Sequence, residues 1–89
     1  MERIATVTVP NRYGLHARPA AELVKLASRF RAEVWVGKEG LEVNGKSIMG
    51  VLMLAAERGS SLTFRASGDD ADDAVSALQS LVAGGFGED

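Results

Sequence analysis

The sequence predicts an α+β fold, an open-faced two-layer sandwich in which a four-stranded sheet carries three helices on one face. Four short segments alternate apolar and polar residues with a period of two, which is typical of strands buried on one side only. Three further segments carry apolar stripes or helix-capping residues, in the order strand, helix, strand, strand, helix, strand, helix. Because the helices all need an apolar surface and the sheet offers one, we expect them on the same face.

The strands are assigned from their alternating apolar positions. These positions are Ala5, Val7 and Val9 in the first strand, Val34 and Val36 in the second, Leu41 and Val43 in the third, and Leu62, Phe64 and Ala66 in the fourth. The residues between them are mostly polar, as expected of a sheet with one solvated face.

The first helix is expected over 18–30, where Ala20, Leu23, Val24 and Ala27 form a stripe at helical spacing. Ser47 is the expected N-cap of a second, short helix that Gly59 closes.

The third helix is expected to be capped by Asp69 or Asp70, with Asp72 and Asp73 in its first turn, and to end at Gly84-Gly85. We expect the tail, 84–89, to be frayed.

The chain has 89 residues, which suits a single domain over 1–89. It has no cysteine, so disulfides and thiolate metal sites are excluded, and we expect neither a metal nor another cofactor. The N-terminus lacks the apolar core of a signal peptide and no apolar run could span a bilayer, which predicts a cytoplasmic protein without direct membrane insertion. A net charge of -2 argues against nucleic acid as a partner.

The charge is unevenly distributed along the chain. Basic residues lie in the first half, at Arg12, Arg18, Lys25 and Lys46. Acidic residues gather at the other end, at Asp69, Asp70, Asp72, Asp73, Glu88 and Asp89. This asymmetry suggests an acidic partner that docks on the basic region. Solvated faces without a partner explain the charge pattern equally well.

The most informative stretch surrounds His16, the only histidine, where the first loop becomes the first helix. With His16 as N-cap, Pro19 falls in the first helical turn, where a missing N–H costs nothing. The backbone N–H groups of Ala17 and Arg18 then form an anion site at the positive end of the helix dipole. The Arg18 guanidinium matches the geometry of a phosphate, and a neutral imidazole is a competent nucleophile. These residues predict a phosphoryl acceptor, although a histidine that merely caps the helix fits the spacing equally well.

The residues that an enzyme would need are missing from the sequence. His16 has no partner histidine or cysteine, and Glu22 lies too far along the helix to orient the ring. Gly45-Lys46-Ser47 lacks the upstream glycine of a phosphate-binding loop. A group that holds phosphoryl until a partner arrives needs none of these residues, so a carrier fits better than an enzyme.

Ser47 is a second candidate site. It is either a helix cap alone or a regulatory phosphorylation site, where a phosphate would place about two negative charges beside Ile48 and Met49. Exposed apolar residues there would form a docking patch, whereas Met49, Leu52 and Met53 at helical spacing could equally be core. We expect Met49 to be exposed and Leu54 to be buried.

Two motifs together carry a family resemblance. Gly14-Leu15-His16-Ala17-Arg18-Pro19-Ala20, followed by Lys46-Ser47-Ile48-Met49-Gly50-Val51, closely resembles HPr, the histidine-containing phosphocarrier family of the bacterial phosphoenolpyruvate-dependent sugar phosphotransferase system. The resemblance covers nearly the whole chain. It implies an antiparallel sheet of order 1-4-2-3. Two departures stand out: the loop with Arg12 and Tyr13 is about one residue longer, which could tilt the approach to the site, and Ala55 replaces a common glycine, which should only tighten the helix.

The resemblance also implies roles and partners. His16 would accept a phosphoryl group on Nδ1 from Enzyme I and pass it to the EIIA domains of sugar permeases, with Arg18 assisting. Ser47 would be the target of a serine kinase/phosphatase and would link the protein to a transcriptional regulator. The partner surface would comprise Ile48, Met49 and Leu52, with Lys25 at its edge. We expect a monomer.

Two other functions remain open from the sequence. One is a purely regulatory binding module acting through Ser47, which the presence of His16 disfavours. The other is a carrier of the nitrogen-related branch, which the residues around Ser47 disfavour.

Overall fold

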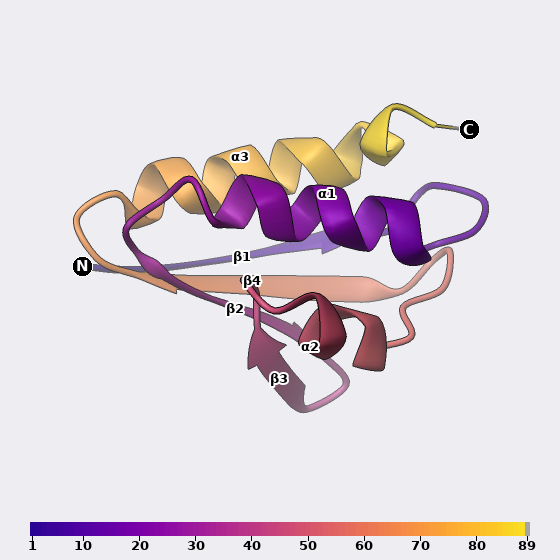
Figure 1. The fold of residues 1–89 in the computed structure, drawn as a ribbon, viewed down its shortest axis with the longest axis horizontal. Coiled ribbons are helices and arrows are strands. Elements are labelled where there is room, and N and C mark those ends of the chain that lie inside the picture. Colours follow the sequence, from indigo (N-terminus) through magenta and orange to yellow (C-terminus); the bar gives the residue numbers. More distant parts are fainter. Residues whose placement is uncertain (89) are drawn as a thin grey trace.

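The computed structural model describes residues 1–88, in which all the predicted helices and strands are present (Figure 1). In chain order they are β1 (Glu2–Thr8), α1 (Ala17–Ala27), β2 (Glu33–Lys38), β3 (Leu41–Asn44), α2 (Ile48–Met53), β4 (Ser61–Ser67) and α3 (Ala71–Ala83), followed by the 3-10 turn η1 (Gly85–Gly87).

The sheet has the order β1-β4-β2-β3, and every neighbouring pair is antiparallel, so the expected topology is confirmed. Thr8 at the end of β1 lies opposite Ser61 at the start of β4. At the other end of the sheet, Ser67 pairs with both Glu2 and Glu33. The loop that leads to His16 therefore leaves from the end of the sheet where β4 begins.

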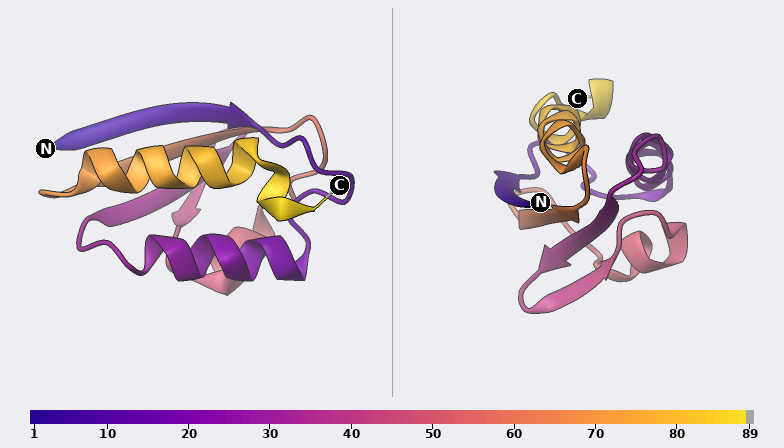
Figure 2. Two further views of the ribbon diagram at one scale, coloured as in Figure 1. Left: turned by 90° about the horizontal axis from the view of Figure 1, so that it is seen from above. Right: turned by 90° about the vertical axis from the view of Figure 1, so that its left-hand side faces the viewer.

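The helices cover one face of the sheet, which gives the two layers seen in Figure 2. The inward positions of β4, namely Leu62, Phe64 and Ala66, are completely buried against them. The predicted period of two is thus confirmed on the central strand, where both neighbours and the helices exclude water. None of the helices formed by residues 1–88 has the length and apolar character needed to cross a bilayer.

The first helix is shorter than the predicted span 18–30. It ends at Ala27, and Ser28 donates both its N–H and its hydroxyl to the carbonyl oxygen of Val24. Beyond it, the N–H of Phe30 bonds the Ala27 oxygen three residues back. The chain thus continues to Phe30 in tightened turns rather than in α-helix.

The second helix ends at Met53, so the expected closure at Gly59 is wrong. The turn is made by Ala55, which adopts a left-handed φ of 47°. The Lys38 ammonium donates to the carbonyl oxygens of Leu54 and Ala55 at 3.2 and 3.3 Å, and so binds the C-terminal end of the helix. The expectation that Ala55 only tightens the helix is also wrong, because this residue lies beyond the helix.

The third helix begins after Asp70 and ends at Ala83, with Gly84 as its C-cap, close to the predicted bounds. The Asp70 carboxylate, however, does not cap α3. It accepts hydrogen bonds from the backbone N–H groups of Arg31 and Ala32, at 2.9 and 2.8 Å, and so ties the start of α3 to the loop before β2.

The prediction that the tail is frayed is wrong for residues 84–88. Residue 89 lies outside the residues that the structure describes. Gly85, Phe86 and Gly87 all have φ between 57° and 73°, which turns the chain back sharply. Phe86 is 4% exposed and belongs to the core. The apolar burial of Phe86 anchors the segment, and Glu88 follows it.

Candidate functional site

His16 is the N-cap of α1, as predicted. Its backbone is extended and its carbonyl oxygen accepts the first helical hydrogen bond, from Ala20 N–H at 3.0 Å. Its side chain makes no capping hydrogen bond to the helix. The first-turn N–H groups of Ala17 and Arg18 therefore have no partner within the helix and face the region in front of it. Pro19 is buried in the same turn.

The backbone of the loop before His16 lies close to the backbone of the segment that follows α2. Gly14 has a φ of +62°, and a Cβ there would lie 2.3 Å from the carbonyl oxygen of Ala56. Leu15 N–H donates to that same oxygen at 2.8 Å. The position where α1 begins is therefore set by the segment that follows α2.

The loop before α1 places an aromatic ring beside the histidine. Tyr13 is 69% exposed, and its ring meets that of His16 edge to face, with centroids 6.1 Å apart. The Arg12 guanidinium lies 5.4 Å from the centroid of the Tyr13 ring. The Arg12 guanidinium, the Tyr13 ring and the His16 ring therefore follow one another in contact along the loop before α1.

The partner of the histidine ring is Glu88, a residue that the sequence analysis did not include among the site residues. His16 Nε2 lies 2.9 Å from Glu88 Oε1, and Arg18 Nη1 lies 3.2 Å from Glu88 Oε2. Arg18 Nη2 also lies 3.8 Å from Glu22. No local pattern indicates this contact, because Glu88 is 72 residues away along the chain.

Asn11 completes the surroundings of the Glu88 carboxylate. It is 1% exposed, and its Nδ2 donates both to the Gly14 oxygen at 2.8 Å and to Glu88 Oε1 at 2.9 Å. Its Oδ1 is buried without a hydrogen-bond partner among residues 1–88. Donors from three residues thus converge on one carboxylate.

These donors lower the pKa of Glu88 from its ordinary value, first through the hydrogen bond from His16 and then through that from Asn11, while desolvation opposes them. An ionised carboxylate only accepts hydrogen bonds, so we assign the ring hydrogen to Nε2 of His16. In the neutral ring, Nδ1 then keeps its lone pair. Among residues 1–88, Nε2 is the ring nitrogen of His16 that makes a hydrogen bond.

Ser47 caps α2, as predicted, and its Oγ accepts a hydrogen bond from Gly50 N–H at 3.2 Å. Met49 is 70% exposed and Leu54 is 4% exposed, so both burial predictions are confirmed. Four neighbouring side chains form an exposed apolar surface, here called the α2 patch: Ile48, Met49, Leu52 and Met53.

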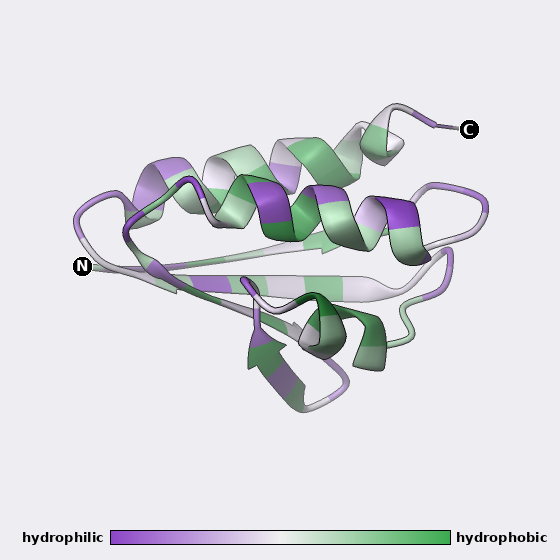
Figure 3. Ribbon diagram, in the orientation of Figure 1, coloured by the Kyte–Doolittle hydropathy of each residue, from purple (hydrophilic) through white to green (hydrophobic). Residues whose placement is uncertain are grey.

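The ribbon of α2 is coloured as hydrophobic over most of its length in Figure 3. The alternative that Met49, Leu52 and Met53 belong to the core is wrong, because all three are exposed, Leu52 to 37% and Met53 to 68%. Lys25, expected at the edge of the same surface, lines a hollow between α1 and α3 together with Leu26 and Leu81. It therefore lies on the side of α1 that faces α3, whereas the patch belongs to α2.

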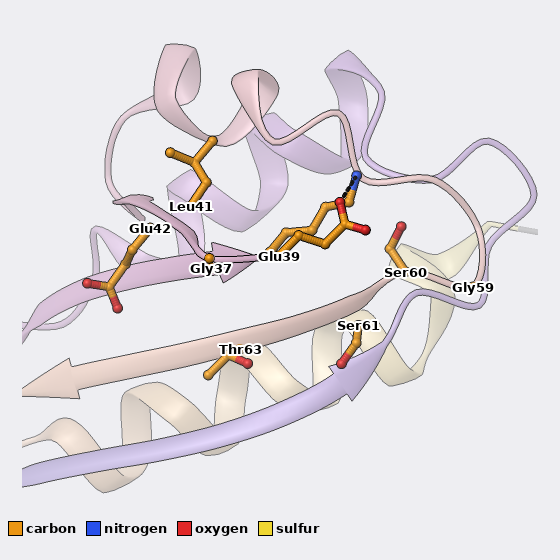
Figure 4. A pocket seen from close by; sticks show the side chains of 10 residues that line it. Gly37, Glu39, Leu41, Glu42, Gly59, Ser60, Ser61 and Thr63 are labelled. Carbon is orange, nitrogen blue, oxygen red and sulfur yellow. Dashed lines mark ion pairs between the residues drawn. The ribbon is translucent and has the colours of Figure 1, made fainter.

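A hollow lies between the β2–β3 hairpin and the start of β4, and His16 is not among the residues that line it (Figure 4). It has a volume of about 560 Å³ and is lined by Lys38, Glu39, Ser60 and Thr63, among others. Lys38 is already held by the carbonyl oxygens after α2. His16, Arg18 and Ser47 lie outside this hollow.

Comparison with known proteins gives consistent matches. Residues 4–84 match the family model for the PTS HPr component phosphorylation site. A phosphocarrier protein HPr from Neisseria meningitidis is 45% identical over 83 residues, which cover 93% of each chain. The crystal structure of HPr-C-His from Thermoanaerobacter tengcongensis superposes with a TM-score of 0.94 at 42% identity, covering 98% of each chain. A phosphocarrier protein HPr from Bacillus anthracis has a TM-score of 0.88 at 43% identity, covering 91% of this chain and 96% of that one.

Proposed function

The chain belongs to the HPr family, the phosphocarriers of the phosphotransferase system, and from this membership we propose that His16 is the residue that carries the phosphoryl group. The protein serves sugar transport as a carrier and not as an enzyme with its own turnover. Family membership implies Enzyme I as phosphoryl donor and EIIA domains as acceptors.

One observation carries the assignment of the site. His16, Arg18 and Asn11 all donate hydrogen bonds to a single carboxylate, that of Glu88. The Arg18 guanidinium and the N-terminus of α1, which lie at this carboxylate, are donors that also suit a phosphoryl group on Nδ1. The nucleophile lies within the same group of residues.

In the proposed step, the lone pair of His16 Nδ1 attacks the phosphorus held by Enzyme I. The P–N bond forms while the bond to the donor breaks, and the donor group keeps that bond's electron pair. Transfer to an EIIA domain repeats the exchange with His16 as leaving group. Arg18 and the N–H groups of Ala17 and Arg18 neutralise the charge on the equatorial oxygens.

We assign the docking surface to the α2 patch, centred on Ile48, Met49 and Leu52. It lies beside α1, which α2 contacts, so a partner seated on it reaches the N-terminus of α1. Its apolar side chains with basic residues nearby are the composition expected of such an interface. We keep Lys25 as a rim contact on the far side of α1.

Ser47 is the proposed regulatory phosphorylation site, recognised by a serine kinase/phosphatase, with a transcriptional regulator as a further partner. A phosphate there would add about two negative charges next to Met49 and would oppose docking on an apolar surface. We propose a monomer that works in the cytoplasm.

The experiment is phosphorylation with phosphoenolpyruvate and Enzyme I, followed by intact mass and acid treatment. We expect one acid-labile phosphoryl group, absent in His16→Ala. Arg18→Ala should slow the transfer at least about tenfold, because it removes a charged donor from the transferring group. A label that persists in His16→Ala would refute the assignment.

The docking surface is tested separately by Met49→Asp. Because Met49 is exposed, the variant should remain folded by circular dichroism and bind Enzyme I more weakly. Unchanged binding by this folded variant would exclude Met49 from the interface.

A further inference from the structure

The sulfur atoms of this chain belong to methionines, and these methionines lie at the surface. The sequence has three methionines and no cysteine. Met1, Met49 and Met53 are 68%, 70% and 68% exposed, so none of them belongs to the core. A peroxide therefore reaches all three thioethers in the folded protein, and no thiol of the chain competes for it.

Two of these methionines are the most exposed residues of the α2 patch. Met49 and Met53 are four residues apart in α2, which makes their side chains neighbours on the same side of the helix. The helix is anchored in the core by Val51, which is completely buried. Ile48 and Leu52 are only 40% and 37% exposed, so the two thioethers form the outer part of the patch.

Oxidation of these two residues changes the polarity of the patch and leaves the core untouched. A lone pair of the methionine sulfur attacks one oxygen of hydrogen peroxide, and the O–O bond breaks. The departing hydroxide takes the proton of the transferred oxygen and leaves as water, so the sulfur is oxidised and the peroxide is reduced. Water satisfies the new sulfoxide oxygen in the free protein, whereas an apolar interface would leave this acceptor without a partner.

We propose that Met49 and Met53 form a reversible oxidation site, at which sulfoxidation by hydrogen peroxide weakens the docking of partner proteins on the α2 patch. This inference rests on the proposed function, because it takes the α2 patch as the docking surface, and it adds a form of regulation to that surface. The residues at His16 are unchanged by the reaction, so the oxidised carrier keeps its phosphoryl chemistry and loses affinity for its partners. A methionine sulfoxide reductase regenerates the thioethers.

The test compares the whole chain before and after treatment with hydrogen peroxide, with peptide mapping by mass spectrometry to show that Met49 and Met53 are both oxidised. Calorimetric titration with Enzyme I should then give a dissociation constant at least about fivefold higher. Phosphorylation by phosphoenolpyruvate and Enzyme I should show a similar rise in KM for the carrier with kcat nearly unchanged. Treatment with the reductase should restore both values.

The matched control is the double variant Met49→Leu/Met53→Leu, measured against its own untreated form. Leucine keeps an apolar side chain of similar volume at both positions but cannot be oxidised. The variant retains Met1, which is as exposed as the other two, so it reports the effect of a sulfoxide outside the patch. Peroxide should change its affinity for Enzyme I less than about twofold. Circular dichroism checks that the oxidised proteins remain folded.

Several results would overturn the proposal. Unchanged affinity after both methionines are oxidised would do so, as would an equal loss in the double variant, which would place the effect outside the patch. Unfolding of the oxidised protein, or an affinity that the reductase does not restore, would show damage instead of a reversible site. Failure of the proposed docking surface looks different, because Met49→Asp would then bind Enzyme I normally without any peroxide. If Met49→Asp weakens binding and peroxide does not, only the oxidation site is wrong.

Discussion

Ala55 occupies a backbone conformation that suits glycine, and replacing it should stabilise the protein. Its φ is 47°, immediately after α2, and its side chain is exposed. Its carbonyl oxygen accepts a hydrogen bond from Lys38, which a change of side chain leaves in place. The substitution Ala55→Gly therefore removes a methyl group from a strained position without removing a contact in the core.

The expected size follows from two opposing terms. The left-handed conformation raises the free energy of a residue with a Cβ by roughly 1–2 kcal/mol, and glycine lacks this strain. Glycine in turn gains freedom in the unfolded chain, which costs about 0.4–1 kcal/mol. The difference is a net stabilisation of about 0.5–1 kcal/mol, or roughly 2–8 °C in Tm for a domain of this size.

The assay is urea unfolding at neutral pH, with Ala21→Gly as a control. Ala21 is also exposed but lies within α1, where glycine should cost about 0.5–1 kcal/mol. The same chemical change should thus have opposite signs at the two positions. If Ala55→Gly destabilises the protein as much as Ala21→Gly, the left-handed strain at Ala55 does not exist and the reasoning is refuted.

Three further predictions concern residues that hold a loop or a helix end in place. Gly14→Ala should destabilise the protein by about 3 kcal/mol in urea unfolding, since its Cβ would clash with the Ala56 oxygen; a loss below about 1 kcal/mol would contradict this. Ser47→Ala should cost about 1 kcal/mol by losing the cap on Gly50, and an unchanged midpoint would show that the cap contributes nothing. Backbone donors from Arg31 and Ala32 lower the pKa of Asp70, so its stabilisation is present above the ordinary aspartate range and lost as pH falls through the lowered pKa. Asp70→Asn should therefore lower Tm at neutral pH and flatten its acid dependence, whereas parallel Tm curves would argue against this linkage.

Local sequence patterns were sufficient for most of the framework. The period-two alternation located all four strands, and the stripe around Leu23 located α1, because these patterns reflect burial on one face. The cap at Ser47 and the N-cap position of His16 were also predictable, since capping depends on side chains next to the helix. The exposure of Met49 followed from its place in the first turn of a short helix.

The tertiary structure decided what depends on distant contacts. Gly59 was a reasonable helix terminator in the sequence, but α2 ends at Met53, where Lys38 of β2 binds the free carbonyl groups beyond the helix. Asp70 had the right place to cap α3, yet its carboxylate serves loop amides from another part of the chain.

Sequence alone therefore determined which residue is the candidate phosphoryl acceptor and which helix presents it. Only the tertiary structure placed the Glu88 carboxylate between His16 and Arg18. The reason is that hydrogen-bond partners across a fold are set by packing, here the burial of Phe86, and packing leaves no periodic signal in the chain.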